Sequence, residues 1–192
     1  MDYKGIRDYT QEELVDIIRS FDEKGLKEFS ATKGGYPVLI RKLINEKVCH
    51  MPILQDGSAI IIRNFDGNIL LQERTDRNLW GLPGGCQDLG EDLRSTAVRE
   101  AKEETNLDIA PESLELIDVL SGESRKNSYP NGDVVYNNTA LYLANVNVTD
   151  MSVLKGDSET KRLAFFNVED VPENLMDKDL IEAYKRYISK QR

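Results

Sequence analysis

One acidic segment, residues 85–107 (GCQDLGEDLRSTAVREAKEETNL), constrains this chain more strongly than any other part of it. At about 100° per residue, a helix over the second half of the segment brings Glu100, Glu103 and Glu104 into one arc about 100° wide. The apolar side chains of the same helix lie directly beside this arc. The segment therefore predicts a helix whose three carboxylates point into one space at the border of the core.

Acid-rich helices are usually solvated faces, and Arg94, Arg99 and Lys102 could neutralise these acids through ordinary surface pairs. Arg99 and Lys102, however, lie farther from the apolar face than the acids do. Like charges four residues apart cost roughly a few tenths of a kcal/mol in water, and more where solvent is excluded. A hard cation such as Mg²⁺ or Mn²⁺ would remove that penalty. We therefore interpret the arc as a divalent-cation site.

The residues at both ends of the predicted helix support this interpretation. Gly84 and Gly85 precede it and allow a sharp turn that brings the main chain close to a ligand. Glu91 and Asp92 stand where acids suit the positive end of a helix. Asn106 follows the last acid, and asparagine accepts the left-handed conformation in which helices often end.

The chain is predicted to divide into a helical N-terminal extension, residues 1–48, and one domain, residues 49–192. Thr10 and Glu13 form a capping box before apolar residues at helical spacing, and a glycine pair follows at Gly34. The extension could be a lid, a dimerisation element or a packing element. We favour assembly into a homodimer.

Strand and turn signals fill most of the domain. We expect strands at residues 59–63, 69–74, 114–119, 134–144 and 163–168, turns at residues 66–67 and 131–132, and a closing helix over residues 177–190. Strands thus precede and follow the acidic helix within one domain.

The segment 85–107 resembles the Nudix box, the signature of the Nudix hydrolase superfamily. Seven residues comply with the family pattern: Gly85, Glu91, Arg99, Glu100, Glu103, Glu104 and Leu107. Ala101 stands where a larger aliphatic residue is usual and Asn106 replaces a glycine, but neither departure removes a catalytic group. Over residues 51–190 the resemblance implies a Nudix fold of the α/β (α+β) class, with a mixed β-sheet sandwiched between helices.

The resemblance also implies roles for the acids. Glu100, Glu103 and Glu104 would bind Mg²⁺ or Mn²⁺, with help from a main-chain oxygen of Gly84 or Gly85. Family members differ in which glutamate accepts the proton of the attacking water, so Glu100, Glu104 and Glu159 all remain candidate bases.

Two further acids and one arginine complete the implied catalytic set. Glu159 precedes a strand where several family members carry an additional metal-binding or base-like glutamate. Asp157 is its near alternative, and a plain surface acid is the competing interpretation. Arg99 is expected to pair with Glu91 and to orient the helix.

Four residues are predicted to contact substrate. By resemblance, Arg74 falls where the family often has a base near substrate phosphate, and Trp80 opens the family-like approach WGLPGG. A solvated arginine at a strand end is the alternative for Arg74. Arg125 and Tyr129 lie in a polar segment, residues 121–133, long enough to be a substrate loop, although an ordinary exposed loop fits as well.

The resemblance implies metal-dependent hydrolysis of a pyrophosphate bond in a nucleoside diphosphate linked to another moiety, such as ADP-ribose or a sugar nucleotide. Hydrolysis of a damaged or surplus nucleoside triphosphate is the alternative. A non-catalytic nucleotide-binding sensor or interaction module is a third possibility, disfavoured because a pure binder has no need for so many carboxylates facing an anion.

Charge and hydropathy limit the partners. With 34 acids against 25 bases, the net charge of −9 argues against a nucleic-acid polymer bound through a basic surface. We find no membrane-length apolar run and no signal-peptide pattern, so we expect a cytoplasmic protein that acts on a small phosphorylated substrate.

Overall fold

The computed structural model describes residues 52–76, 78–129, 132–148 and 151–191, together with Thr10, Glu12 and Asp16. Apart from those three residues, the predicted N-terminal extension and its boundary at residue 48 lie outside the described part of the chain. The contacts divide the described residues into two units. The smaller unit holds residues up to 56, 86–91 and 121–138, and the larger unit holds residues 57–85, 92–120 and 139 onwards.

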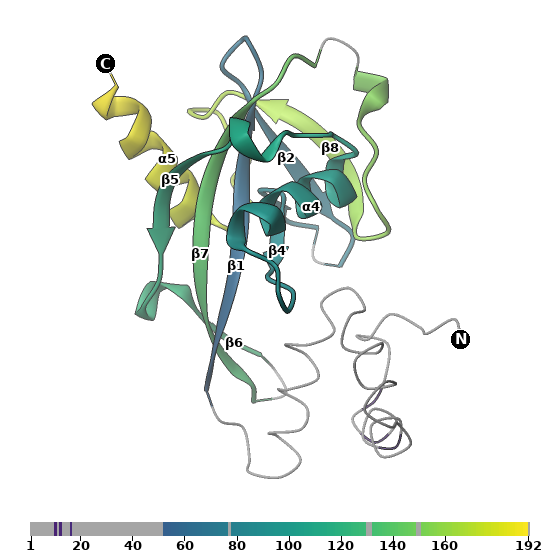
Figure 1. The fold of residues 1–192 in the computed structure, drawn as a ribbon, viewed down its shortest axis with the longest axis vertical. Helices are drawn as coiled ribbons and strands as arrows, with labels where there is room; N and C mark the ends of the chain where they lie inside the picture. The colour runs from purple at the N-terminus through teal and green to yellow at the C-terminus, as the bar shows by residue number, and fades with distance from the viewer. Residues whose placement is uncertain are drawn as a thin grey trace. The chain divides into compact units, whose positions relative to one another are not determined.

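A sheet forms the centre of the larger unit (Figure 1). Its strand order is β3 (Trp80–Gly81), β2 (Ile69–Arg74), β1 (Ile53–Arg63), β7 (Val134–Asn145) and β5 (Glu115–Leu120). Off this path, β8 (Thr160–Phe166) pairs antiparallel with β2, and β4 (Gly84–Cys86) pairs with β1. β1 and β7 begin in the smaller unit and continue into the larger one.

The second half of β1, residues 59–62, is apolar on both faces because each face is covered by a helix. Ile61 packs in the same cluster as residues of α5 (Lys178–Lys190), whereas Ile60 and Ile62 pack with residues of α4 (Leu93–Thr105). All three isoleucines are fully buried. The sheet therefore lies between the two helices, as Figure 1 shows for α4 and α5.

The predicted hairpin at residues 66–67 is present, with Gly67 in the left-handed region at φ 81° between β1 and β2. Two strands extend beyond their predicted bounds. β1 begins at Ile53 rather than at residue 59, and β8 runs over Thr160–Phe166 rather than over residues 163–168. In both cases the missed residues are mostly polar, so the apolar pattern that marked the rest of the strand was absent.

In the smaller unit, β6 (Lys126–Ser128) pairs antiparallel with the first residues of β7. The amide of Tyr129 donates to the carbonyl of Asp133 at 2.8 Å and closes the connection between these strands. Asn131 of the predicted turn lies outside the described residues. No helix in the described ranges is long and apolar enough to cross a membrane.

Candidate active site

Helix α4 carries the predicted metal-binding acids and is capped at both ends. Its N-cap residue is Asp92, whose carboxylate accepts hydrogen bonds from the amides of Arg94 and Ser95, both at 2.9 Å. Its C-cap residue is Asn106, at φ 64°, and the amide of Asn106 donates to the carbonyl of Lys102. The left-handed helix end predicted at Asn106 is confirmed.

Two of the three acids on α4 are buried. Glu100 is 5% exposed and Glu104 is 3% exposed, and the fully buried Ala97 and Ala101 lie on the same side of the helix. The side chain of Glu103 is 34% exposed. The helix thus directs two carboxylates inward at the edge of the core and keeps the third at the rim.

Two donors hold the carboxylate of Glu104. Its Oε2 atom accepts hydrogen bonds from the main-chain amide of Gly84 at 2.8 Å and from the side-chain amide of Gln72 at 2.7 Å. Burial, and next the charge of Glu100, raise the pKa of Glu104 to about 7, although the bonds from Gln72 and Gly84 act in the opposite direction. Glu104 therefore lies in a place where a negative charge is costly.

The carboxylate of Glu100 lies against the main chain at Gly85. A Cβ atom at Gly85 would collide with both carboxylate oxygens of Glu100, so only glycine permits this approach. The Nη1 atom of Arg99 donates to Glu100 at 2.6 Å and lies 3.5 Å from Glu103. Arg99 thus bridges two of the acids.

The segment of residues 83–85, which includes the start of strand β4, lies against β1. The amide of Ile60 donates to the carbonyl of Pro83 at 2.9 Å, and a Cβ atom at Gly84 would collide with the main chain of Ser58 and Ala59. At Gly84 this segment therefore lies so close to the main chain of β1 that only glycine fits, and it lies beside the two buried carboxylates.

The donor set suits a hard divalent cation. The charge of Glu100 raises the pKa of Glu104, and a cation held between them would relieve that repulsion. In the described part of the chain, no three His, Cys, Asp or Glu side chains are already grouped closely enough to hold a metal ion. The carboxylate oxygens of these residues are the ligand type that Mg²⁺ and Mn²⁺ prefer. Glu100 and Glu104 would be the buried ligands and Glu103 the partly exposed one.

Arg74 and Glu159, predicted separately from the sequence, lie together. The Nη2 atom of Arg74 donates to Oε2 of Glu159 at 2.7 Å, and its Nε atom donates to Asp76 at 3.0 Å. Burial lowers the pKa of Arg74, but the hydrogen bonds with Asp76 and Glu159 outweigh it and raise the pKa overall. The nearby Asp157 accepts a hydrogen bond from the amide of Glu159 at 2.9 Å, which fixes the approach to β8.

The other predicted substrate residues differ in their placement. Trp80 is 5% exposed and its ring meets Phe166 edge-on, with centroids 4.9 Å apart, while the guanidinium of Arg162 lies 4.8 Å from the ring centroid. This placement favours a packing role for Trp80 over the predicted contact with substrate. Arg125 and Tyr129, both half-buried, belong to the smaller unit.

Glu91 also belongs to the smaller unit, where its carboxylate accepts a hydrogen bond from the amide of Asp88 at 3.2 Å. Arg99 belongs to the larger unit. The expected pairing between Glu91 and Arg99 therefore stays a prediction.

Gln72 is a residue of this site that sequence analysis missed. It is 1% exposed, follows the buried Ile69–Leu71 run of β2, and donates to Glu104 across 32 positions of sequence. A glutamine that directly follows a fully apolar run of a strand indicates a buried polar contact, because a buried amide needs a hydrogen-bonding partner.

We expect the metal-free protein to lose stability as the pH rises from 4.5 to about 7, because the pKa of Glu104 is raised across this window. A carboxyl group with a higher pKa in the folded chain holds its proton more tightly there. Its stabilising contribution is therefore complete below pH 4.5 and lost as the pH rises through about 7. The loss is at most about 3–4 kcal/mol, since the pKa of Glu104 is raised from 4.5 to about 7 and one pKa unit corresponds to about 1.4 kcal/mol.

Urea unfolding at a series of pH values, with a chelator present, measures this loss. Glu104→Gln is the control and should flatten the profile between pH 4.5 and 7. Glu73 and Asp92 have lowered pKa values, so their contributions are lost below this window rather than within it. A wild-type profile as flat as that of the variant would contradict the prediction.

Comparison with known proteins identifies the family of this fold. The NUDIX domain model matches residues 54–188. An ADP-ribose pyrophosphatase of Methanocaldococcus jannaschii is 30% identical over 142 residues, which cover 72% of this chain and 75% of that protein. A Bacillus subtilis protein that carries the provisional name 8-oxo-dGTP diphosphatase is 46% identical over 54 residues, or 28% of this chain and 36% of its own length.

A solved structure also matches the fold of this chain. The NUDIX domain of Shewanella oneidensis NrtR, determined with ADP ribose, matches with a TM-score of 0.54 at 19% identity, over 91% of this chain and 97% of that chain. The chain belongs to the Nudix hydrolase superfamily. The predicted family and the predicted fold class are thereby confirmed. The chain spans little more than a third of the length of the Bacillus relative.

Proposed function

We propose that this protein hydrolyses a pyrophosphate bond in a nucleoside diphosphate linked to another moiety, and that it needs Mg²⁺ or Mn²⁺ to do so. The observation that carries the proposal is the pair of buried carboxylates, Glu100 and Glu104, beside Gly84 and Gly85 at the start of β4. The archaeal relative, aligned over three quarters of its length, is named for hydrolysis of ADP-ribose, which belongs to this substrate class.

In this mechanism Glu100, Glu103 and Glu104 would hold the cation, which when bound would supply positive charge beside the phosphate oxygens and lower the pKa of a water molecule. The oxygen of that water bonds to one phosphorus atom, and the bond from this phosphorus to the bridging oxygen breaks. The bridging oxygen leaves on the other phosphate, so that two phosphomonoesters form.

The chain's own residues prepare this step. The Gly84 amide and Gln72 fix Glu104, while Arg99 holds Glu100. Glu100, Glu104 and Glu159 are the candidate acceptors of the water proton. Arg74 offers a guanidinium to substrate phosphate, and its present bond to Glu159 would have to open or be shared.

The second candidate function is hydrolysis of a nucleoside triphosphate to a monophosphate and pyrophosphate. The Bacillus relative favours it, because a protein with that provisional name is 46% identical to this chain, although over 54 residues only. The chemistry at the acids would be the same, and the two candidates differ in the group that leaves.

A substrate panel tests the proposal. The purified full chain should be incubated with ADP-ribose, a sugar nucleotide, dGTP and 8-oxo-dGTP, each with Mg²⁺, with Mn²⁺ and with a chelator, and products separated by chromatography. We expect metal-dependent release of a nucleoside monophosphate and a sugar phosphate from the first two. Release of pyrophosphate from the triphosphates alone would favour the second candidate. Binding without turnover across the panel would favour a nucleotide-binding module.

A further inference from the structure

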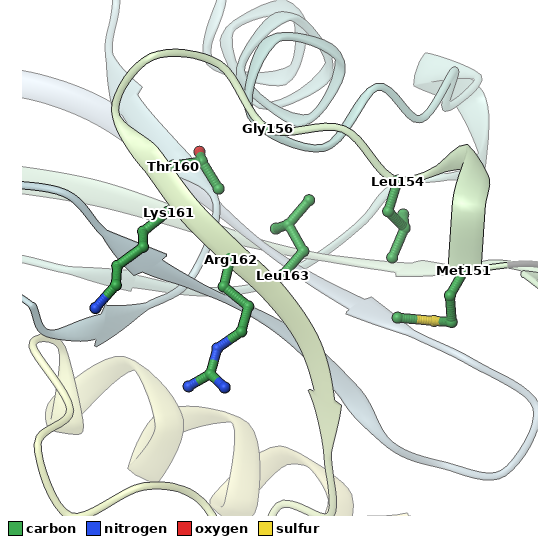
Figure 2. A pocket seen from close by; sticks show the side chains of 7 residues that line it. All are labelled: Met151, Leu154, Gly156, Thr160, Lys161, Arg162 and Leu163. Atoms are coloured by element: carbon green, nitrogen blue, oxygen red, sulfur yellow. The ribbon is translucent and has the colours of Figure 1, made fainter.

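The pairing of β2 with β8 contains a bulge close to Glu104. Glu73 pairs with Arg162, but the next residue, Arg74, pairs with Thr160, so Lys161 is an extra residue on β8. As a result the side chains of Lys161 and Arg162 point the same way, and both contact the carboxylate of Glu73. Figure 2 shows these two side chains on one side of the strand and those of Thr160 and Leu163 on the other.

The bulge brings the Thr160 hydroxyl to the buried side chain of Gln72. The Oγ1 atom of Thr160 lies 2.9 Å from Oε1 of Gln72 and 3.2 Å from Oδ1 of Asp157, and it can donate to either. If the same residues continued as a regular strand, with Lys161 in the alternation, the Thr160 side chain would turn to the opposite face of the sheet. The bulge thus links Gln72 to the segment that ends in Glu159 and Thr160.

The Gln72 amide has a fixed orientation between its two neighbours. An ionised carboxylate only accepts, so the nitrogen of Gln72 faces Glu104 at 2.7 Å and its oxygen faces the Thr160 hydroxyl. A continuous line of hydrogen bonds therefore runs from Glu104 on α4, through Gln72 on β2, to Thr160 on β8.

We propose that Gln72 is a positioning residue for catalysis. Its amide fixes the orientation of the Glu104 carboxylate and connects that carboxylate to the segment carrying Asp157, Glu159 and Thr160. This inference rests on the proposed metal-binding function of Glu104. Gln72 contacts neither substrate nor the reacting atoms, and it acts only through the two hydrogen bonds of its amide. Partners that orient a metal ligand contribute about 10–100-fold to metal affinity or activity.

A purely structural role for Gln72 makes different predictions. If the amide only filled space in the core, an apolar side chain of similar volume would preserve metal binding. Gln72→Met is that replacement, since methionine has nearly the same length and no hydrogen-bonding amide. Ile62→Val, which removes one methylene group from the buried face of the sheet, is the control for a general loss of stability.

The first measurement is Mn²⁺ binding to the full-length protein without substrate, by titration calorimetry. We expect Gln72→Met to weaken binding about 10-fold or more, and Ile62→Val to leave it unchanged. Thr160→Val should weaken it less but in the same direction, and Thr160→Ser, which keeps the hydroxyl, should restore it. Wild-type affinity in Gln72→Met would overturn the inference.

The second measurement uses turnover of whichever substrate the panel identifies. Gln72→Met should lower kcat about 10–100-fold with little change in KM. In the Glu104→Gln background it should cause no further loss, because its target is already absent. An equal loss in both backgrounds would overturn the positioning role.

The outcomes separate the inference from the proposed function. If Glu104→Gln binds Mn²⁺ as tightly as the wild type, the metal site itself is wrongly assigned. If Glu104→Gln loses the metal while Gln72→Met keeps it, the site stands and the role of Gln72 falls. If Gln72→Met fails to fold, the Thr160→Val and Thr160→Ser pair decides, because Thr160 lies on the far side of the Gln72 amide from Glu104.

Discussion

Replacing Glu104 by glutamine is expected to lower kcat/KM at least about 100-fold while leaving the fold intact. The amide keeps the volume of the carboxylate, and its oxygen can still accept from the Gly84 and Gln72 donors. The substitution removes the negative charge that would attract a divalent cation and that could accept a proton from water. The loss is therefore chemical rather than structural.

The same substitution should stabilise the metal-free protein at neutral pH. It removes a buried charge whose ionisation is opposed by burial and by Glu100. On one preparation, kinetic assays measure the loss of turnover, Mn²⁺ titration measures the loss of metal affinity, and thermal unfolding measures the gain in stability. Glu112→Gln makes the same chemical change at an exposed position and is the matched control. Turnover close to the wild type in Glu104→Gln would contradict the assignment of the site.

Gly85→Ala is expected to lower kcat/KM at least about 10-fold with little effect on stability, by displacing a partner that orients the site. The new methyl group would collide with the carboxylate of Glu100, which is the flexible end of a side chain and can swing away. The protein would then fold normally with one of its two buried acids misdirected.

Gly84→Ala is the contrasting variant and should cost about 1–3 kcal/mol of stability. Its methyl group would collide with the main chain of Ser58 and Ala59 on β1, which cannot move without disturbing the sheet. Gly67→Ala measures the cost of a left-handed φ without any collision, since it has open space around it and a φ of 81°. Unfolding curves and kinetics on all three variants check the contrast. Equal stability losses in Gly84→Ala and Gly85→Ala would contradict it.

Much of α4 could be predicted because the residues that determine its ends and its buried face are close together in the sequence. The cap at Asp92, the end at Asn106 and the inward direction of Glu100 and Glu104 all follow from residues within a few turns of one another. A period of 3.6 residues is enough to say which acids share a face, and the structure agrees for the two that are buried.

The long-range contacts of the site could not be predicted in the same way. Gln72 and Thr160 are 88 positions apart, and Arg74 and Glu159 are 85 positions apart. Their contacts depend on which strand pairs with β2 and on the register of that pairing, including the bulge at Lys161. A local pattern specifies which side of a strand is apolar, but it does not specify the partner strand or a one-residue shift between them.

The burial of Trp80 has a practical consequence. It is the only tryptophan of the chain, and it lies in the core of the larger unit against Phe166. Its fluorescence should therefore shift when that unit unfolds and its ring meets water. The protein carries an intrinsic optical reporter whose signal comes from one known position, so the unfolding of each variant can be followed without a label.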